Sequence, residues 1–535
     1  MKDKTRLSDL SRPSGEQLLH LDPEDLQPLP MSRNDGSSGR AWAPLSQQVR
    51  DRYECDLDDT CALSLPRPKT PEQERELVGQ FLAGLEKLFT RENNWTFLQP
   101  LLLTVEHCAR CQTCSDACHV YESSGRAEIY RPTYRSEVFR RLYYKHVKGG
   151  GLLSAWQHGA IDLTWSMVAR LAELAYRCNL CRRCAQTCPI GADNGLVTHE
   201  IRKLFSQEMG IAPKELHESG SMLQLKSGSS TGMNARAVRD NVQFIDEEMS
   251  EKTGLAVETP WDVEGADILL IHNAGEVLAW PENPGAFAVL LNAAGVSWTL
   301  SSELAAYDAV NYGLWYDDAQ LARVALMHAQ VAKKLKVGKI VMGECGHAHK
   351  ALFVIADRIL TGDLNIPRES CLTLLRDIVV GGRVKLDPSR NDFPVTLHDP
   401  CNMVRLMGIV EPQREILRRI CPQFREMHPH GVDNYCCGGG SGFAIMSGHN
   451  FQDWRAQVSG RKKIEQILNA FAECLDPSRP KYVCAPCSNC KGQIRDALNY
   501  HDLWEKHRIL YGGLVELIVN AMEDVTPGFI EWEWR

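Results

Sequence analysis

The apolar positions of the chain first become periodic after Thr70. Residues 1–69 mix Ser, Pro, Asp and Arg without a sustained pattern, so an extended or partly disordered N-terminal arm is expected there. Thr70 and Pro71 are typical of a helix N-cap and a first helical position. An apolar helix face follows, formed by Leu77, Phe81, Leu85 and Leu88. The first helix is therefore predicted to begin at Pro71.

A second helix is expected from about Asp162 into Cys178. Its apolar positions are Leu163, Val168, Leu171, Leu174 and Ala175. Between Gly210 and about Asp262 the sequence becomes polar and rich in Gly and Ser, over a length too great for a turn. We interpret residues 211–262 as a linker between domains.

Beyond the linker, short apolar runs alternate with helical segments such as 286–294. The runs are 268–271, 296–300, 339–342, 395–397 and 482–483. This alternation predicts an α/β domain with a mainly parallel sheet. Ligands of such domains bind at the carboxyl ends of the strands, and the last two runs end at cysteines.

Charge and hydropathy exclude several classes of protein. The net charge of −8 leaves no basic surplus to neutralise phosphates, which argues against a nucleic-acid binder. The N-terminus has no apolar run of a secretory signal, and no stretch is apolar enough to span a membrane. We expect a cytoplasmic protein that reaches a membrane only through a partner.

The chain has 20 cysteines, of which 14 fall into three tight groups. In a reducing compartment they are not expected to form a disulfide framework, and the grouping indicates metal. Buried packing is predicted for most of the scattered ones, namely Cys55, Cys61, Cys371, Cys421 and Cys474.

The first two groups share the spacing C-x2-C-x2-C-x3-C, which is typical of ferredoxins that bind two cubane [4Fe–4S] clusters. They are Cys108, Cys111, Cys114 and Cys118, and Cys178, Cys181, Cys184 and Cys188. In this arrangement the fourth cysteine of each run ligates the other cluster. The predicted ligand sets are Cys108, Cys111, Cys114 with Cys188, and Cys178, Cys181, Cys184 with Cys118.

Three details refine this prediction. Pro189 follows the second run as in ferredoxins, whereas His119 stands where the first run should have its proline. The 59 residues between the runs suggest a helical ferredoxin module. Zinc, the alternative metal, typically uses two separated C-x2-C pairs and not four cysteines in eleven residues.

The third group comprises HDPC at 398–401, CCGGG at 436–440 and CAPCSNC at 484–490. Adjacent cysteines suit one tetrahedral ion poorly but can bridge the irons of an open cluster. Gly438, Gly439 and Gly440 allow close approach of the backbone and unusual dihedral angles.

This pattern resembles the cysteine-rich (CCG) domain of heterodisulfide reductases and related iron–sulfur subunits. The resemblance implies one non-cubane [4Fe–4S] cluster, held by five thiolates, at which disulfide bonds are cleaved or made. Cys401, Cys436 and Cys437 match directly, and Cys487 and Cys490 complete the set, with Cys484 as an alternative to one of them. Lys491 and Arg405 would stabilise thiolate charge, or are ordinary solvated charges.

CCG domains usually occur as two copies, so the resemblance also implies an internal repeat. The first copy, residues 263–390, has the strands but no CC pair, and keeps only Cys345, His347 and His349. We interpret it as degenerate, with Cys345 either lining the active cavity or remaining as a packing residue. The expected fold class is α+β and α/β multidomain: a helical two-cluster domain at 70–210, then the degenerate repeat and an intact CCG repeat at 391–535.

Within this family the chain most resembles the cytoplasmic iron–sulfur subunits of membrane complexes associated with dissimilatory sulfite reductase. The resemblance covers about residues 70–535 and is carried by CNLCRRCAQTCPIGADNG, HDPCNMVRLMGIVEPQREILRR and NYCCGGGSGFAIMS. It implies a haem b integral-membrane subunit and other complex subunits as partners. It also implies a small sulfur-carrier protein of the DsrC type as substrate, presented as a disulfide or trisulfide.

Two alternatives stay open. The first is a heterodisulfide reductase, or the iron–sulfur subunit of a glycolate, lactate or glycerol-phosphate dehydrogenase, although these usually have two intact repeats. The second is an electron-transfer subunit whose third cluster is structural. The direction of electron flow is not encoded in these motifs.

Overall fold

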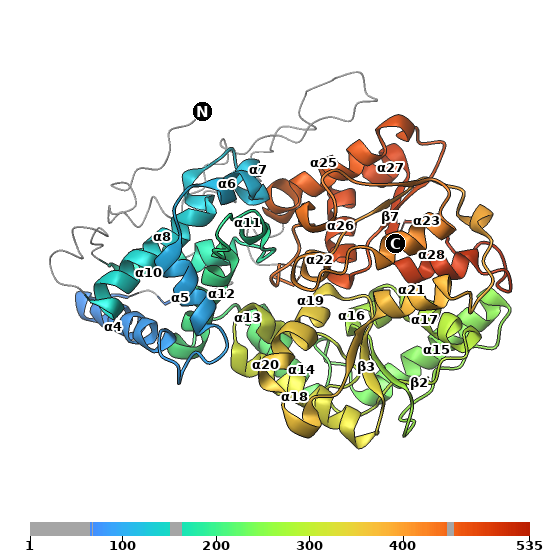
Figure 1. Cartoon of the computed structure of the whole chain (residues 1–535), viewed down its shortest axis with the longest axis horizontal. Helices are drawn as coiled ribbons and strands as arrows, with labels where there is room; N and C mark the ends of the chain where they lie inside the picture. Colours follow the sequence, from blue (N-terminus) through green and yellow to red (C-terminus); the bar gives the residue numbers. More distant parts are fainter. Residues whose placement is uncertain (1–64, 67, 150–162, 444, 447–453, 535) are drawn as a thin grey trace.

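The computed structural model describes residues 65–534 apart from 67, 150–162, 444 and 447–453, and gives no side chains for 354–356. Figure 1 shows a mainly helical region on the left and two α/β units on the right. The predicted N-terminal arm, with Cys55 and Cys61, lies almost wholly outside the described residues. Among the described helices, none combines the length and apolar character that crossing a membrane requires.

The N-terminal region is helical, as predicted. Thr70 caps the first helix, since its hydroxyl accepts from the Gln73 amide, and Phe81 packs on Phe205 at a ring distance of 5.6 Å. The predicted helix before Cys178 is also confirmed. The helices of this region are α4 (Pro71–Leu88), α5 (Leu98–His107), α6 (Thr113–Ala117), α7 (His119–Ser123), α8 (Pro132–Leu142), α10 (Trp165–Tyr176), α11 (Arg183–Gln186) and α12 (Asn194–Met209).

Residues 211–262, predicted to connect two domains, are largely helical. They form α13 (Lys214–Leu216), α14 (Leu223–Ser227) and α15 (Ala235–Thr253). The last of these is capped by the Asn234 side chain and ends at Gly254 in a left-handed conformation. Its apolar face packs on α17 (Glu282–Ala293) through Val238, Val242, Ile245 and Met249. These apolar positions recur at intervals of four, three and four residues, between charged positions.

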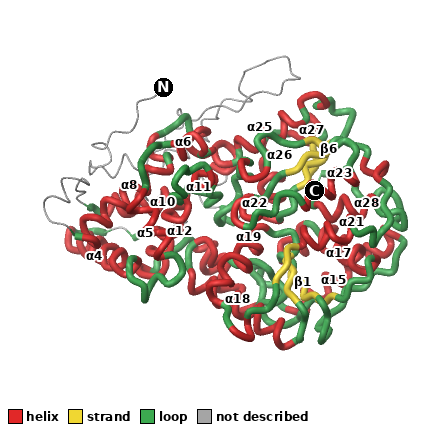
Figure 2. The backbone as a smooth tube through the Cα atoms, viewed as in Figure 1, coloured by secondary structure: helices red, strands yellow, loops and turns green. Residues whose placement is uncertain are grey.

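The described residues form two four-stranded parallel sheets, seen as two yellow groups in Figure 2. The strands are β1 (Ile268–Ile271), β2 (Trp298–Thr299), β3 (Lys339–Met342) and β4 (Arg368–Ser370), then β5 (Val395–Leu397), β6 (Phe424–Arg425), β7 (Lys481–Cys484) and β8 (Ile509–Gly512). The strand orders are β2-β1-β3-β4 and β6-β5-β7-β8, so one topology occurs twice. This recurrence confirms the mainly parallel α/β fold and supports the internal repeat.

Helices of the two repeats pack on each other and share one core. Helix α17 lies against α28, and α21 lies against α23, so that Leu372, Leu417 and Leu517 belong to one buried cluster. Cys371 and Cys421 are buried in this core, as predicted for packing cysteines. The remaining helices are α16 (Ala274–Ala279), α18 (Asp318–Lys334), α19 (Gly346–His349), α20 (Ala356–Ile359), α21 (Cys371–Val380), α22 (Cys401–Leu406), α23 (Pro412–Ile420), α25 (Arg461–Ala470), α26 (Ser488–Tyr500), α27 (Leu503–His507) and α28 (Leu514–Ala521).

Candidate metal centres

The first two cysteine runs have the same backbone shape. The residues two and four positions after the first cysteine adopt left-handed dihedrals in both runs, with φ of 54° and 70° at Arg110 and Gln112, and 49° and 59° at Leu180 and Arg182. This conformation is uncommon for residues other than glycine. Its occurrence at equivalent positions indicates that both loops are bent to turn three thiols toward one point.

The fourth cysteine of each run lies beside the other run. Burial raises the pKa of the Cys114 thiol to about 12, and the neighbouring thiols that add to this rise include Cys188. Burial likewise raises the pKa of Cys118 to about 12, with further contributions from Cys178 and Cys181. The structure thus brings the thiols together in the two predicted sets, and four soft sulfur donors suit an iron–sulfur cluster.

We expect Cys188→Ser to perturb the cluster of the Cys108 run, because Cys188 lies with that run. Electron paramagnetic resonance (EPR) spectra of the reduced protein should lose the signal that Cys108→Ser also removes. Cys118→Ser is the matched control and should affect the signal that depends on Cys178. If Cys188→Ser altered only the latter signal, the crossed ligand sets would be wrong.

The second set of thiols contacts the third group. Cys436 lies within hydrogen-bond distance of Cys181, and this contact is the main cause that lowers the pKa of the Cys181 thiol. His119, which stands where ferredoxins have proline, also lies within hydrogen-bond distance of Cys181 and helps lower the pKa of its thiol. Its Nε2 lies 2.9 Å from Asn179 Oδ1, and Asn179 Nδ2 donates to the Gly438 carbonyl at 2.8 Å. The departure from the motif therefore joins the two domains.

Arg405 also joins these domains, so it is not an ordinary solvated charge. It donates to the Cys181 carbonyl at 2.7 Å and to the Val432 carbonyl at 2.8 Å, and also to the Asn434 carbonyl. Its charge helps lower the pKa of Cys181. Arg405 was predicted to act on thiolates of the third group, and it instead acts on Cys181 of the second set.

The third group gathers five cysteines from three segments. Sγ of Cys437 lies 3.4 Å from Sγ of Cys490, Cys436 is within hydrogen-bond distance of Cys401, and Cys490 of Cys487. None of the five is more than 8% exposed. Cys401 begins α22, and Cys487 is the N-cap of the 13-residue helix α26, whose N-terminal dipole favours thiolate. These sulfurs fit the five-thiolate set that the resemblance implies.

Cys484, the alternative ligand, points away from this group. Successive side chains of a strand lie on opposite faces of the sheet. Tyr482 and Cys484 of β7 join the core shared by the two repeats, whereas Val483 joins the cluster that contains the five cysteines. The geometry therefore favours Cys487 and Cys490.

The glycines after the CC pair are required by space. Gly438 has a φ of 95°, and a Cβ there would lie 2.4 Å from the Gly460 amide nitrogen. At Gly439 a Cβ would lie 2.5 Å from Cβ of Gln493. The loop that carries the two adjacent cysteines is thus pressed against helix α26 and against residues 459–460.

The positive charge at the third group comes from a residue that the sequence did not single out. Lys491 forms a fully buried ion pair with Glu276 at 3.1 Å, so the prediction that it acts on thiolates is not supported. Lys463, also fully buried, lies near Cys436, Cys437 and Cys490, and burial lowers its pKa to about 8. His398 of the HDPC motif was also missed as a site residue, and it lies beside Cys437 and Cys490.

The first repeat has the same positions with different residues. His272 follows β1 as His398 follows β5, but Gly275 stands where the second repeat has Cys401. Cys345 is the N-cap of α19 as Cys487 is of α26. It is fully buried beside His347 Nδ1 at 3.3 Å, and the following amide, of Gly346, donates to Cys487 Sγ at 3.2 Å. The degenerate repeat thus places one thiol next to the third group; its role stays a prediction.

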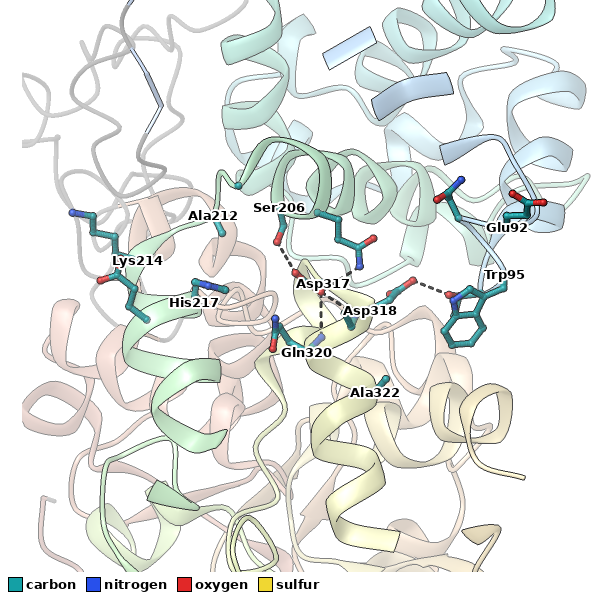
Figure 3. A pocket seen from close by; sticks show the side chains of 16 residues that line it. Glu92, Trp95, Ser206, Ala212, Lys214, His217, Asp317, Asp318, Gln320 and Ala322 are labelled. Carbon is teal, nitrogen blue, oxygen red and sulfur yellow. Dashed lines mark hydrogen bonds between the residues drawn. The ribbon is translucent and has the colours of Figure 1, made fainter. Parts of the chain in front are cut away.

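The largest cavity among those described lies apart from these cysteines. It has a volume of about 720 Å³ and is lined by residues 92, 93, 95 and 96, the end of α12, the segment 210–218 and the start of α18 (Figure 3). Of its acidic residues, Asp317 caps α18 and accepts from Ser206 Oγ at 2.8 Å, and Asp318 pairs with Lys203 at 3.0 Å. Its described lining contains no cysteine.

Comparisons with known proteins agree with this arrangement. The family model "4Fe-4S dicluster domain" matches residues 104–192, and the model "Cysteine-rich domain", CCG, matches residues 395–495. An Hdr-like menaquinol oxidoreductase iron–sulfur subunit 2 of Archaeoglobus fulgidus is 27% identical over 85% of this chain and 84% of its own length. The corresponding subunit of Archaeoglobus profundus is 26% identical, with the same coverage of 85% and 84%.

A third relative is a component of the dihydromethanophenazine:CoB–CoM heterodisulfide reductase of Methanosarcina acetivorans. It is 25% identical over 74% of this chain and 89% of its own length. In these matches and in the grouping of its cysteines, the chain is similar to Hdr-like iron–sulfur subunits, and its residues 395–495 match the cysteine-rich CCG domain.

Proposed function

We propose that this protein transfers electrons between a membrane partner and a sulfur substrate, and makes or cleaves a sulfur–sulfur bond at the third cysteine group. Two cubane and one non-cubane [4Fe–4S] clusters would supply one-electron redox chemistry when bound. The observation that carries the proposal is the contact of Cys181 with Cys436. It places a thiol of the dicluster region directly beside the CC pair.

The exposure of the cysteines supports a direction along the molecule. Cys111 of the first set is exposed, whereas Cys436 and Cys437 are buried. The first set therefore offers the end at which a redox partner can approach, the second set lies between, and the third group is the interior end. Electron flow in either sense is compatible with this order.

The residues around the third group suit sulfur–sulfur chemistry. Cleavage of a disulfide consumes two electrons and two protons and yields two thiols, so negative charge develops on two sulfurs in turn. The N-terminus of α26 and the ammonium of Lys463 both face the cysteines and favour such charge. Burial excludes bulk water, which strengthens both interactions.

We further propose the identity of the partners. The motifs quoted above are similar to DsrK, the cytoplasmic subunit of the DsrMKJOP complex, which implies a haem b integral-membrane subunit and a sulfur carrier of the DsrC type. Under this proposal the protein lies at the cytoplasmic face of the inner membrane, held there by its partner. The relatives, named as menaquinol oxidoreductase and heterodisulfide reductase subunits, are compatible with a quinone-linked complex.

A small heterodisulfide is the second candidate substrate, favoured by the similarity to the Methanosarcina protein. The test is to reduce the protein with a viologen donor and to offer either a small heterodisulfide or a carrier protein with an oxidised pair of C-terminal cysteines. We expect thiols to appear on the carrier protein at the faster rate. Faster release of the small thiols would replace the proposed substrate, and release from neither would favour an electron-transfer subunit without catalysis.

The three cysteine groups predict the metal content. Anaerobically purified protein should contain about twelve iron and about twelve sulfide per chain, at four of each per cluster. Metal analysis of the same sample measures zinc. Stoichiometric zinc with little sulfide would contradict the cluster assignment.

A further inference from the structure

His398 lies against the third cysteine group with no other partner among the described residues. It is fully buried at the carboxyl end of β5. One of its ring nitrogens lies within 4.8 Å of both Cys437 Sγ and Cys490 Sγ, and these two sulfurs lie within the same distance of each other. Neither ring nitrogen has a standard hydrogen bond to another described residue. A buried polar group without a partner is costly, so this position calls for a function.

Lys463 approaches the same sulfurs from α25. Its ammonium donates to Asn434 Oδ1 at 2.7 Å and to Gln466 Oε1 at 2.6 Å, and it contacts Met427 Sδ at 3.5 Å. These contacts hold the charge in place, since Asn434 in turn donates to the Asp399 carbonyl at 2.8 Å. Asp399 itself is paired with Arg414, and its charge also acts on Lys463 and favours the ammonium form.

We infer that His398 donates an N–H hydrogen bond to Cys437, and that His398 and Lys463 together favour the more negatively charged, reduced state of the third centre. The His398 ring and the Lys463 ammonium both lie near sulfur in a site without bulk water, where hydrogen bonds and charge interactions are strong. Hydrogen bonds and charges around sulfur ligands are known to tune cluster potentials. This inference rests on the proposed cluster at the third group and assigns two positioning residues to it.

The first repeat supplies a matched control. His272 follows β1 as His398 follows β5, and is likewise buried, but its ring packs edge-on against Phe287 at 5.3 Å. Gly275 stands where the second repeat has Cys401. His272→Gln therefore removes an imidazole from the equivalent position in the repeat that lacks the cysteine group.

The experiment compares His398→Gln, Lys463→Met and His272→Gln in the full chain, purified anaerobically. Iron and sulfide are counted, and the protein is titrated with redox mediators while EPR follows the signal that Cys437→Ala removes. At a fixed solution potential we expect the ratio of reduced to oxidised third centre to fall at least tenfold in the first two variants, which is about 59 mV for a one-electron couple. The His272→Gln protein should titrate like the wild type, and Lys463→Arg should restore most of the change in Lys463→Met.

The possible outcomes separate this inference from the proposed function. Full iron content with unchanged titration of the third centre in His398→Gln and Lys463→Met would overturn the inference and leave the proposed function intact. Loss of about four irons in His398→Gln, or the strong nitrogen hyperfine coupling of a direct ligand in protein labelled with ¹⁵N-histidine, would also overturn it, because His398 would then bind iron. A wild-type protein without a third cluster would instead contradict the proposed function.

Discussion

Replacing Cys437 by Ala is expected to abolish reduction of the disulfide substrate, with turnover falling to the background of the assay. Cys437 is buried, contacts Cys490 at 3.4 Å, and belongs to the CC pair that no cubane set contains. The two cubane sets do not share this residue, so they should still accept electrons from a chemical donor. The measurement is oxidation of a reduced viologen coupled to disulfide reduction, with EPR of the cubane clusters on the same sample.

Cys484→Ala is the matched control for this experiment. Cys484 belongs to the same CAPCSNC motif, but its side chain lies on the other face of β7, in the core shared by the repeats. The variant should keep the full iron content and most of the turnover, with at most a modest loss of stability. Substantial turnover by Cys437→Ala would refute the catalytic role of the third group and make an electron-transfer subunit the better account.

Arg414→Met is expected to destabilise the CCG repeat by about 3–5 kcal/mol, because it leaves a buried carboxylate without its partner. Arg414 forms a bidentate pair with Asp399 at 2.8 and 2.7 Å, and both side chains are about 1% exposed. The pair lowers the pKa of Asp399 and holds the HDPC segment against α23. Thermal unfolding of the anaerobic protein should shift down by roughly 10 °C, and iron of the third centre should be lost first.

Arg418→Met, one turn further along α23, gives the control. Arg418 is 58% exposed and pairs with Glu411 at 3.5 Å, also on the surface. Exposed ion pairs contribute about 0–1 kcal/mol, so its melting temperature should stay close to that of the wild type. Equal shifts in the two variants would show that loss of arginine from this helix matters more than the buried pair with Asp399.

Features that depend on local spacing were predictable from the amino-acid residues alone. The four cysteines of each ferredoxin run lie within eleven residues, so their spacing reflects the loop that must bend around a cluster. The strands were predictable because parallel strands buried on both faces read as short continuous apolar runs. The first helix followed from its cap and its apolar face. In α15 the apolar positions stand between charged ones, so the local composition resembles a polar linker.

Contacts between side chains that are distant in the sequence became evident from the folded structure. The CAPCSNC motif does not distinguish Cys484 from Cys487 as a ligand. The alternation of side chains along β7 places Cys484 away from the third group. Lys491 follows the last cysteine directly, but it pairs with two carboxylates, Glu276 of the other repeat and Glu516. Lys463 instead reaches the sulfurs from a separate helix. Such contacts depend on how sheets and helices pack across long sequence separations, and local periodicity carries no information about them.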